Sequence, residues 1–131
     1  MTQKDIYILT KKELDINEVK TILDYNLTIE LSDEVKNIIS TNRKFLESKI
    51  DSDNNLYYGI NTGFGSLCNH AISKDDLKKL QINLVRSHAC GAGEEIDTIL
   101  VKLMLLLKIN ALSLGSSGIQ LATVERLVYL F

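Results

Sequence analysis

The sequence contains no proline, no tryptophan and only two cysteines among its 131 residues. Average usage would give about six prolines in a chain of this length. Because proline lacks a backbone N–H and breaks helices, its absence favours a mainly helical protein. Two cysteines, Cys68 and Cys90, do not make a disulfide framework, and a reducing cytoplasm is the simplest compartment for them.

Strong net charge and long apolar runs are also absent. The formal net charge of -2 argues against nucleic acid or an anionic membrane as a partner, since either would call for a basic surface. Lys102, Lys108 and Asn110 interrupt the most apolar segment, so we expect no membrane span. The first residues do not resemble a signal peptide. Hydrophobic residues make up 45% of the chain, which is enough for the core of one domain.

A metal site is the next class to consider, because Cys68 and Cys90 could combine with His70 and His88. Their spacing fits no zinc pattern well. Free buried thiols are the simpler interpretation, and we predict no metal.

Hydrophobic periodicity predicts two short strands, 6–9 and 27–31, that pair near the start of the chain. Between them, a helix over 17–23 follows a cap at Asp15 or Asn17. Ser32 then caps a helix that runs to about residue 48. One apolar stripe of that helix consists of Val35, Ile38, Ile39, Phe45 and Leu46. A polar break over 51–55 follows it.

Three further helices are predicted after residue 72. Ser73 and Asp76 approximate a capping box, and the helix that follows buries a stripe of Leu77, Leu80, Leu84 and His88. The segment 94–113 is apolar on nearly every side, which is typical of a helix inside a larger protein. A last helix begins near Ser117 and reaches Phe131 without a stop signal, as a truncated bundle helix would.

The stretch 57–65, Tyr-Tyr-Gly-Ile-Asn-Thr-Gly-Phe-Gly, has neither helical nor strand periodicity and holds three of the seven glycines. This pattern therefore predicts an ordered loop. Glycines at 59, 63 and 65 permit positive φ or the close approach of another group. Ordered loops of this kind are usually functional or mobile.

This loop and several later blocks keep the order and spacing found in one family. They are Tyr58-Gly59-x-Asn61-Thr62-Gly63-Phe64-Gly65, Leu80-Gln81-x-Asn83-Leu84, Ser87-His88-Ala89-x-Gly91-x-Gly93-Glu94, 103–112 and Ser117-Gly118-Ile119. From about Leu14 onward the chain resembles the histidine and aromatic amino-acid ammonia-lyases, and most closely the histidine lyases. The resemblance implies that 1–131 is the N-terminal domain of their mainly α fold. It would consist of a small two-stranded β/α element over 1–31 and a helical part over 32–131, with the central helical bundle absent.

The resemblance assigns Tyr58 as the base that removes a β-proton from the substrate. A phenol is a poor base at neutral pH unless positive charge or hydrogen bonds stabilise its phenolate. From spacing alone, Tyr58 would be a tyrosine packed at a loop edge; the full motif reverses that preference. Asn61 and Gly65 are weaker candidates for substrate binding, and a turn-capping role for Asn61 is equally consistent with the sequence.

His88 is the candidate for choosing the substrate. From pattern alone, a histidine on a leucine stripe is a core residue. In the family, however, the pair before Ala89 is Ser-His in histidine lyases, typically His-Leu in tyrosine lyases and Phe-Leu in phenylalanine lyases. This chain has Ser87-His88. The resemblance therefore implies that His88 binds the imidazole of L-histidine, since imidazoles donate and accept hydrogen bonds.

The family forms its electrophile, 4-methylidene-imidazol-5-one, from an internal Ala-Ser-Gly triplet that this sequence lacks. Ser116-Ser117-Gly118 matches a different family segment. The implied activity is elimination of ammonia from L-histidine to trans-urocanate by a homotetramer, and the 131-residue chain alone is expected to be inactive. The alternatives are a catalytically silent fragment or assembly partner, and part of a tyrosine or phenylalanine lyase or aminomutase.

Overall fold

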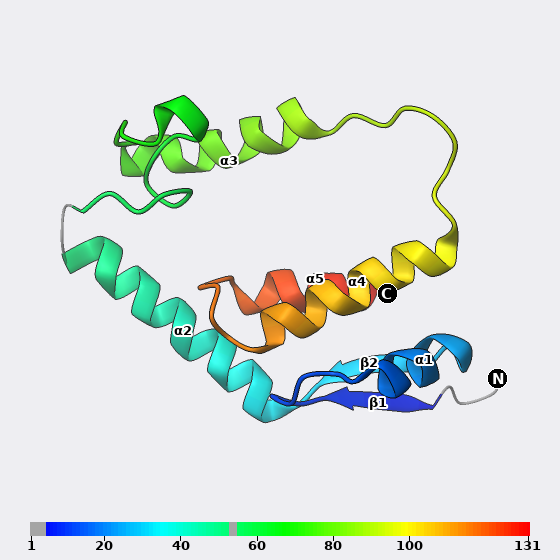
Figure 1. Cartoon of the computed structure of the whole chain (residues 1–131). Helices are drawn as coiled ribbons and strands as arrows, with labels where there is room; N and C mark the ends of the chain where they lie inside the picture. Colours follow the sequence, from blue (N-terminus) through cyan, green and yellow to red (C-terminus); the bar gives the residue numbers. More distant parts are fainter. Residues whose placement is uncertain (1–4, 53–54) are drawn as a thin grey trace. The chain divides into compact units, whose positions relative to one another are not determined.

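The computed structural model describes residues 5–52 and 55–131, which form two compact units. Among the described residues, the first unit combines 5–47 with 95–131, and the second comprises 48–52 and 55–94. The elements of the first unit are β1 (Ile6–Leu9), α1 (Ile16–Asp24), β2 (Thr28–Leu31), most of α2 (Asp33–Ser52), α4 (Thr98–Ser113) and α5 (Leu121–Leu130) (Figure 1). The second contains the end of α2, the 3₁₀ turn Gly65–Leu67 and α3 (Lys74–His88). The expected mainly α fold with a small β element is confirmed.

The two predicted strands form a parallel pair, in which Ile6 lies opposite Thr28 and Leu9 opposite Leu31. A parallel pair needs a crossover, because the chain must return to the same end of the sheet. Helix α1 supplies that crossover.

Both ends of α1 are fixed by local hydrogen bonds. Asp15 Oδ1 accepts the N–H groups of Asn17 and Glu18 at 2.8 and 2.9 Å, and Glu18 Oε2 accepts the Asp15 N–H at 2.9 Å. This capping box confirms Asp15, and not Asn17, as the cap. At the other end Asn26 takes φ 48°, and the Leu27 N–H donates to the Ile22 carbonyl, as in a Schellman motif.

Glu18 also accepts a 3.0 Å hydrogen bond from the Tyr7 hydroxyl on β1. Burial, followed by the bond to Glu18, raises the pKa of Tyr7 to about 12. The Asp15 backbone N–H, followed by Tyr7 and Lys12, lowers the pKa of the Glu18 carboxyl. Glu18, the second member of the capping box of α1, is thereby tied to the first strand.

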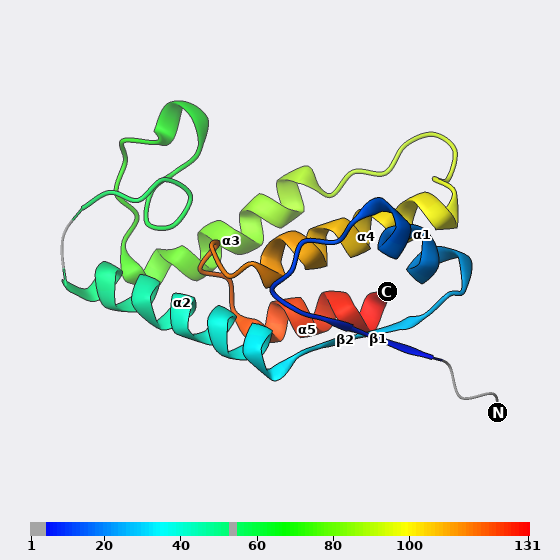
Figure 2. The ribbon, with the colours of Figure 1, turned by 60° about the horizontal axis from the view of Figure 1, so that its bottom comes forward.

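The core of the first unit lies where β2, α1 and α2 meet the α4–α5 hairpin (Figures 1 and 2). Helix α4 packs against α1 and α5, and α5 packs against β2. The buried apolar residues are Leu9, Ile22, Ile29, Leu31, Val35, Ile39, Leu106, Ile109, Leu112 and Val124. In the part of the chain that the structure describes, no helix is long and apolar enough to cross a membrane.

Helix α2 departs from the sequence prediction in two ways. It continues to Ser52, past the end expected near residue 48, because the polar residues there include no glycine or proline and suit a solvated helix. Phe45 does not join the buried stripe of Val35 and Ile39, since its side chain is 60% exposed.

The last two helices begin later than predicted. Helix α4 begins at Thr98 and not at residue 94, because the Asp97 side chain accepts the Ile99 N–H at 3.0 Å and caps it there. Helix α5 begins at Leu121 and not near Ser117, because Gly118 has φ +67°, which no right-handed helix contains.

The turn between α4 and α5 is bound to α2 through Gly118. The Gly118 N–H donates to Asn42 Oδ1 at 2.7 Å, and its carbonyl accepts from Arg43 Nη1 at 3.2 Å. A Cβ at this position would lie 2.5 Å from Leu46 Cδ2. Glycine is therefore required both by the backbone conformation and by the space available.

Candidate active site

The glycine-rich loop of the second unit is held in shape by Asn61. Asn61 Oδ1 accepts the Tyr57 N–H at 2.6 Å, and its amide nitrogen donates to the Asn55 carbonyl at 2.9 Å. An antiparallel bridge between Thr62 and Ala71 closes the loop, with the Ile72 N–H donating to the Asn61 carbonyl at 2.9 Å. Both ends of the Asn61 amide are thus used to cap the turn, the alternative considered from the sequence. Substrate binding by Asn61 stays a prediction.

Glycine is needed at each of these three loop positions for a local reason, and the reason differs between them. Gly59 and Gly65 take φ +73° and +55°, which side-chain-bearing residues rarely adopt. Gly63 has no positive φ, but a Cβ there would lie 2.8 Å from the Leu67 carbonyl oxygen. The Gly59 N–H donates to Thr62 Oγ1 at 3.4 Å and the Gly63 N–H to the His70 carbonyl at 3.2 Å. These N–H groups therefore stabilise the loop itself.

Tyr58 projects from this loop with 65% of its surface exposed. Its ring meets Phe64 edge-on, with ring centroids 6.0 Å apart and an interplanar angle of 74°. The ring thus has one aromatic neighbour, while most of its surface stays exposed. The phenol is accessible to a substrate, as the role of a base requires.

His88 is the last residue of α3 and is exposed, so the prediction that it lies on a buried face was wrong. The stripe of Leu77, Leu80 and Leu84 is only half-buried, and the helix ends before His88 can be covered. His88 Nδ1 lies 2.8 Å from the Leu84 carbonyl oxygen and 3.0 Å from Ser87 Oγ. Within the described residues, no hydrogen bond or ring contact joins it to Tyr58.

A pocket of about 310 Å³ separates the loop from α3. Its walls are Gly63, Phe64, Leu67, His70, Ile72, Leu80, Asn83, Leu84 and Ser87. The pocket is mostly apolar with a few polar groups, which is common in small-molecule sites. It lies beside Ser87 but includes neither Tyr58 nor His88. His70 was considered from the sequence only as a metal ligand, and Asn83 only as part of a matched block; neither was predicted to line a small-molecule pocket.

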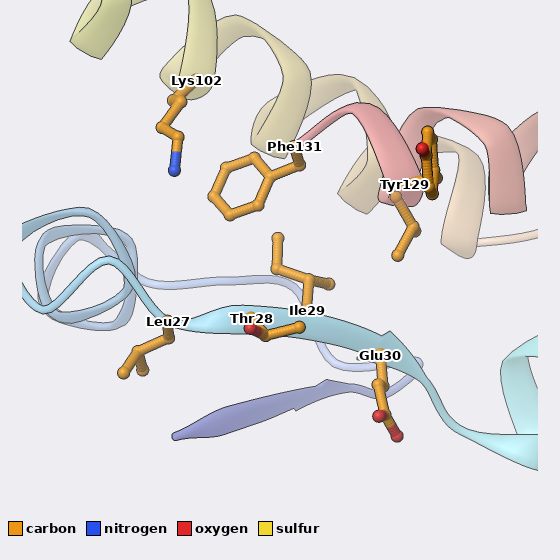
Figure 3. A pocket seen from close by; sticks show the side chains of 8 residues that line it. Leu27, Thr28, Ile29, Glu30, Lys102, Tyr129 and Phe131 are labelled. Atoms are coloured by element: carbon orange, nitrogen blue, oxygen red, sulfur yellow. The ribbon is translucent and has the colours of Figure 1, made fainter. Parts of the chain in front are cut away.

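A second pocket, of about 370 Å³, lies in the first unit between β2 and the ends of α4 and α5 (Figure 3). The Lys102 ammonium group lies 4.9 Å from the centre of the Phe131 ring and donates to Asn26 Oδ1. Ile29 points toward Phe131, whereas Glu30 points away (Figure 3). None of the predicted site residues lines this pocket, so it is not the candidate site.

The structure gives no support to a metal or to the family electrophile in these residues. Across residues 5–52 and 55–131, no three histidine, cysteine, aspartate or glutamate side chains are grouped to hold a metal. Both cysteines are free, and Cys90 is exposed, contrary to the expectation of buried thiols.

The segment most similar to Ala-Ser-Gly is Ser116-Ser117-Gly118. It has a structural role, since the Gly118 N–H and carbonyl form hydrogen bonds with side chains of α2. These residues do not fit the methylidene-imidazolone group.

Comparison with known proteins places this geometry in a family. The family model described as aromatic amino acid lyase matches residues 14–131. The chain is 44% identical over 125 residues to a histidine ammonia-lyase of Legionella pneumophila, covering 95% of this chain and 24% of that protein. It is 40% identical over 121 residues to a histidine ammonia-lyase of Clostridium tetani, covering 92% of this chain and 23% of that protein.

Solved structures give the same fold. Histidine ammonia-lyase of Trypanosoma cruzi matches with a TM-score of 0.77 at 36% identity, over 94% of this chain and 24% of that one. Phenylalanine aminomutase of Pantoea agglomerans matches with a TM-score of 0.85 at 28% identity, over 97% of this chain and 24% of that one. The chain thus spans about a quarter of the length of these relatives. The ordered motifs, the fold and the family match together show that this chain belongs to the aromatic amino acid lyase family.

Proposed function

We propose that this chain is the N-terminal domain of a histidine ammonia-lyase that eliminates ammonia from L-histidine to give trans-urocanate. The observation that carries the proposal is the Ser87-His88 pair, which exposes an imidazole at the end of α3 in a chain 38–44% identical to enzymes of that name. Residues 1–131 form that domain; a division near residue 31 stays a prediction. The enzyme is a cytoplasmic homo-oligomer, a tetramer by family resemblance.

Two steps fall to this chain's own residues. The exposed Tyr58 phenol takes the β-proton. His88 forms a hydrogen bond with the substrate imidazole. A site built for that bond rejects phenylalanine, because its polar groups would be left unpaired in the complex. The rest of the chemistry belongs to residues that this chain does not contain, since it has no Ala-Ser-Gly.

The test is a hybrid protein in which this chain replaces the matching quarter of the Legionella pneumophila enzyme. Urocanate formation from L-histidine is followed by absorbance, with L-tyrosine and L-phenylalanine as competing substrates. We expect the hybrid to act on L-histidine and the 131-residue chain alone to be inactive. An assembled hybrid that forms no urocanate would refute the proposal.

Tyr58→Phe in this hybrid identifies the base, because it removes the hydroxyl and keeps the ring against Phe64. It should lower kcat by about 10²–10⁴-fold, the usual effect of removing a positioned acid–base group. Tyr57→Phe is the matched control and should change kcat much less. A larger loss in Tyr57→Phe would assign the base to the other tyrosine.

Two alternatives have support of their own. The fold of a phenylalanine aminomutase, matched at a TM-score of 0.85, favours a lyase or aminomutase acting on another aromatic amino acid. Preference of the hybrid for L-phenylalanine or L-tyrosine would favour it. The missing Ala-Ser-Gly favours a catalytically silent fragment or assembly partner. Sequencing the coding DNA beyond the Phe131 codon tests that alternative, since a continuing frame with Ala-Ser-Gly would oppose it.

A further inference from the structure

We propose that Ser87, together with the Leu84 carbonyl, holds His88 in the tautomer that carries its proton on Nδ1, so that Nε2 is presented as a hydrogen-bond acceptor. The inference deepens the proposed function and, as a statement about substrate, rests on it. It makes Ser87 a positioning residue that acts through His88.

The geometry at the end of α3 determines where the proton lies. His88 Nδ1 is 2.8 Å from the Leu84 carbonyl oxygen. A carbonyl oxygen can only accept, so a hydrogen bond at this distance requires the proton on Nδ1. In a neutral imidazole the other nitrogen, Nε2, then carries the lone pair.

Ser87 completes a triangle of polar atoms. Its hydroxyl donates to the same Leu84 carbonyl at 3.0 Å, and its oxygen lies 3.0 Å from His88 Nδ1. Because that hydroxyl proton is used on Leu84, the serine oxygen offers a lone pair to the Nδ1–H. The Nδ1 proton therefore has two acceptors, and both are on the helix that carries the ring.

The consequence is a defined chemical preference. Among the residues described, none is hydrogen-bonded to His88 Nε2, which remains available to a ligand. A lone pair there accepts an N–H, and a neutral substrate imidazole has an N–H in either of its tautomers. A phenyl ring has no donor to offer. The Ser-His pair thus works as one unit, in which the serine sets which nitrogen of the histidine meets the substrate.

The experiment is ¹⁵N NMR on the 131-residue chain with labelled histidine, at alkaline pH so that the imidazole rings carry no charge. The sequence has two histidines, and His70→Gln assigns the signals of His88. We expect the His88 Nδ1 to be of the protonated type and Nε2 of the unprotonated type. In Ser87→Ala the ratio of the two tautomers should shift by about two- to tenfold toward Nε2–H, as expected for the loss of one hydrogen bond.

Ser87→Thr is the matched control, because threonine keeps a hydroxyl that reaches the same carbonyls in a helix. It should restore the tautomer ratio of the unmodified chain. A predominant Nε2–H form in the unmodified chain, or a ratio unchanged in Ser87→Ala, would overturn the inference. The readout does not depend on turnover. If His88 carried its proton on Nδ1 as expected but the hybrid formed no urocanate, only the proposed function would be refuted. If the hybrid formed urocanate but His88 did not hold this tautomer, only this inference would be refuted.

Discussion

Replacing Gly115 by alanine should destabilise the first unit severely, for two separable reasons. Gly115 has φ +74°, and a left-handed conformation costs a residue with a Cβ about 1–2 kcal/mol. The added Cβ would also lie 2.1 Å from Ile38 Cγ2, and forcing extra volume into a packed site costs about 1–3 kcal/mol. The sum, about 2–5 kcal/mol, is a large share of the roughly 5–15 kcal/mol that stabilises an ordinary domain.

A double-mutant cycle with Ile38→Ala separates the two terms. Removing the Ile38 side chain beyond Cβ relieves the overlap, because the new methyl would then lie 3.4 Å from the Ile38 Cβ. The double variant should therefore lose about 1–3 kcal/mol less than the sum of the two single variants. Urea denaturation followed by far-UV circular dichroism, at one protein concentration for all variants, measures each free energy of unfolding.

Gly91→Ala is the control, since Gly91 is exposed, has no positive φ and has open space around it. It should change the free energy of unfolding by no more than about 0.5 kcal/mol. If Gly115→Ala were as mild as the control, the close packing of this turn on α2 would be wrong. If the effects of Gly115→Ala and Ile38→Ala were additive, the steric part of the reasoning would fail.

Four further outcomes are expected. In the hybrid, His88→Leu with Ser87 retained should cost about 1.5–3 kcal/mol in kcat/KM for L-histidine, and an unchanged value would leave His88 with no part in substrate binding. Because the pKa of Glu18 is lowered in the folded state, its stabilising effect is present above the ordinary value of 4.5 and is lost as the pH falls. Urea titrations at several pH values should show this loss of stability in the unmodified chain and not in Glu18→Gln. Because the pKa of Tyr7 is raised to about 12 in the folded state, the free energy of unfolding of the protein should fall as the pH rises from 10 to 12. Tyr7→Phe should remove that fall. The exposed apolar face of α4 should bind an apolar fluorescent dye and promote association; Met104→Lys should reduce both, while Asn37→Lys, on an exposed part of α2, should not.

The sequence by itself determined the features that depend on neighbouring residues. Strands near 6–9 and 27–31, a cap at Asp15 or Asn17 and the cap at Ser73 were all predictable, because capping and alternation involve side chains only a few positions apart. The glycine-rich loop was predictable for the same reason. The ordered motifs also identified the family, since their order and spacing are properties of the chain itself.

Only the tertiary structure decided where α5 begins, how the strands pair and whether His88 is covered. Gly118 lies outside α5 in a left-handed conformation, and its backbone is bound by Asn42 and Arg43, about 75 residues earlier. No local pattern reports such a partner. The leucine stripe of α3 predicted burial for His88, but a stripe states only which side chains share a face. Whether a residue on that face is buried depends on how far the neighbouring chain covers the helix. Here the partly buried part of the face extends to Leu84, and the His88 ring is exposed.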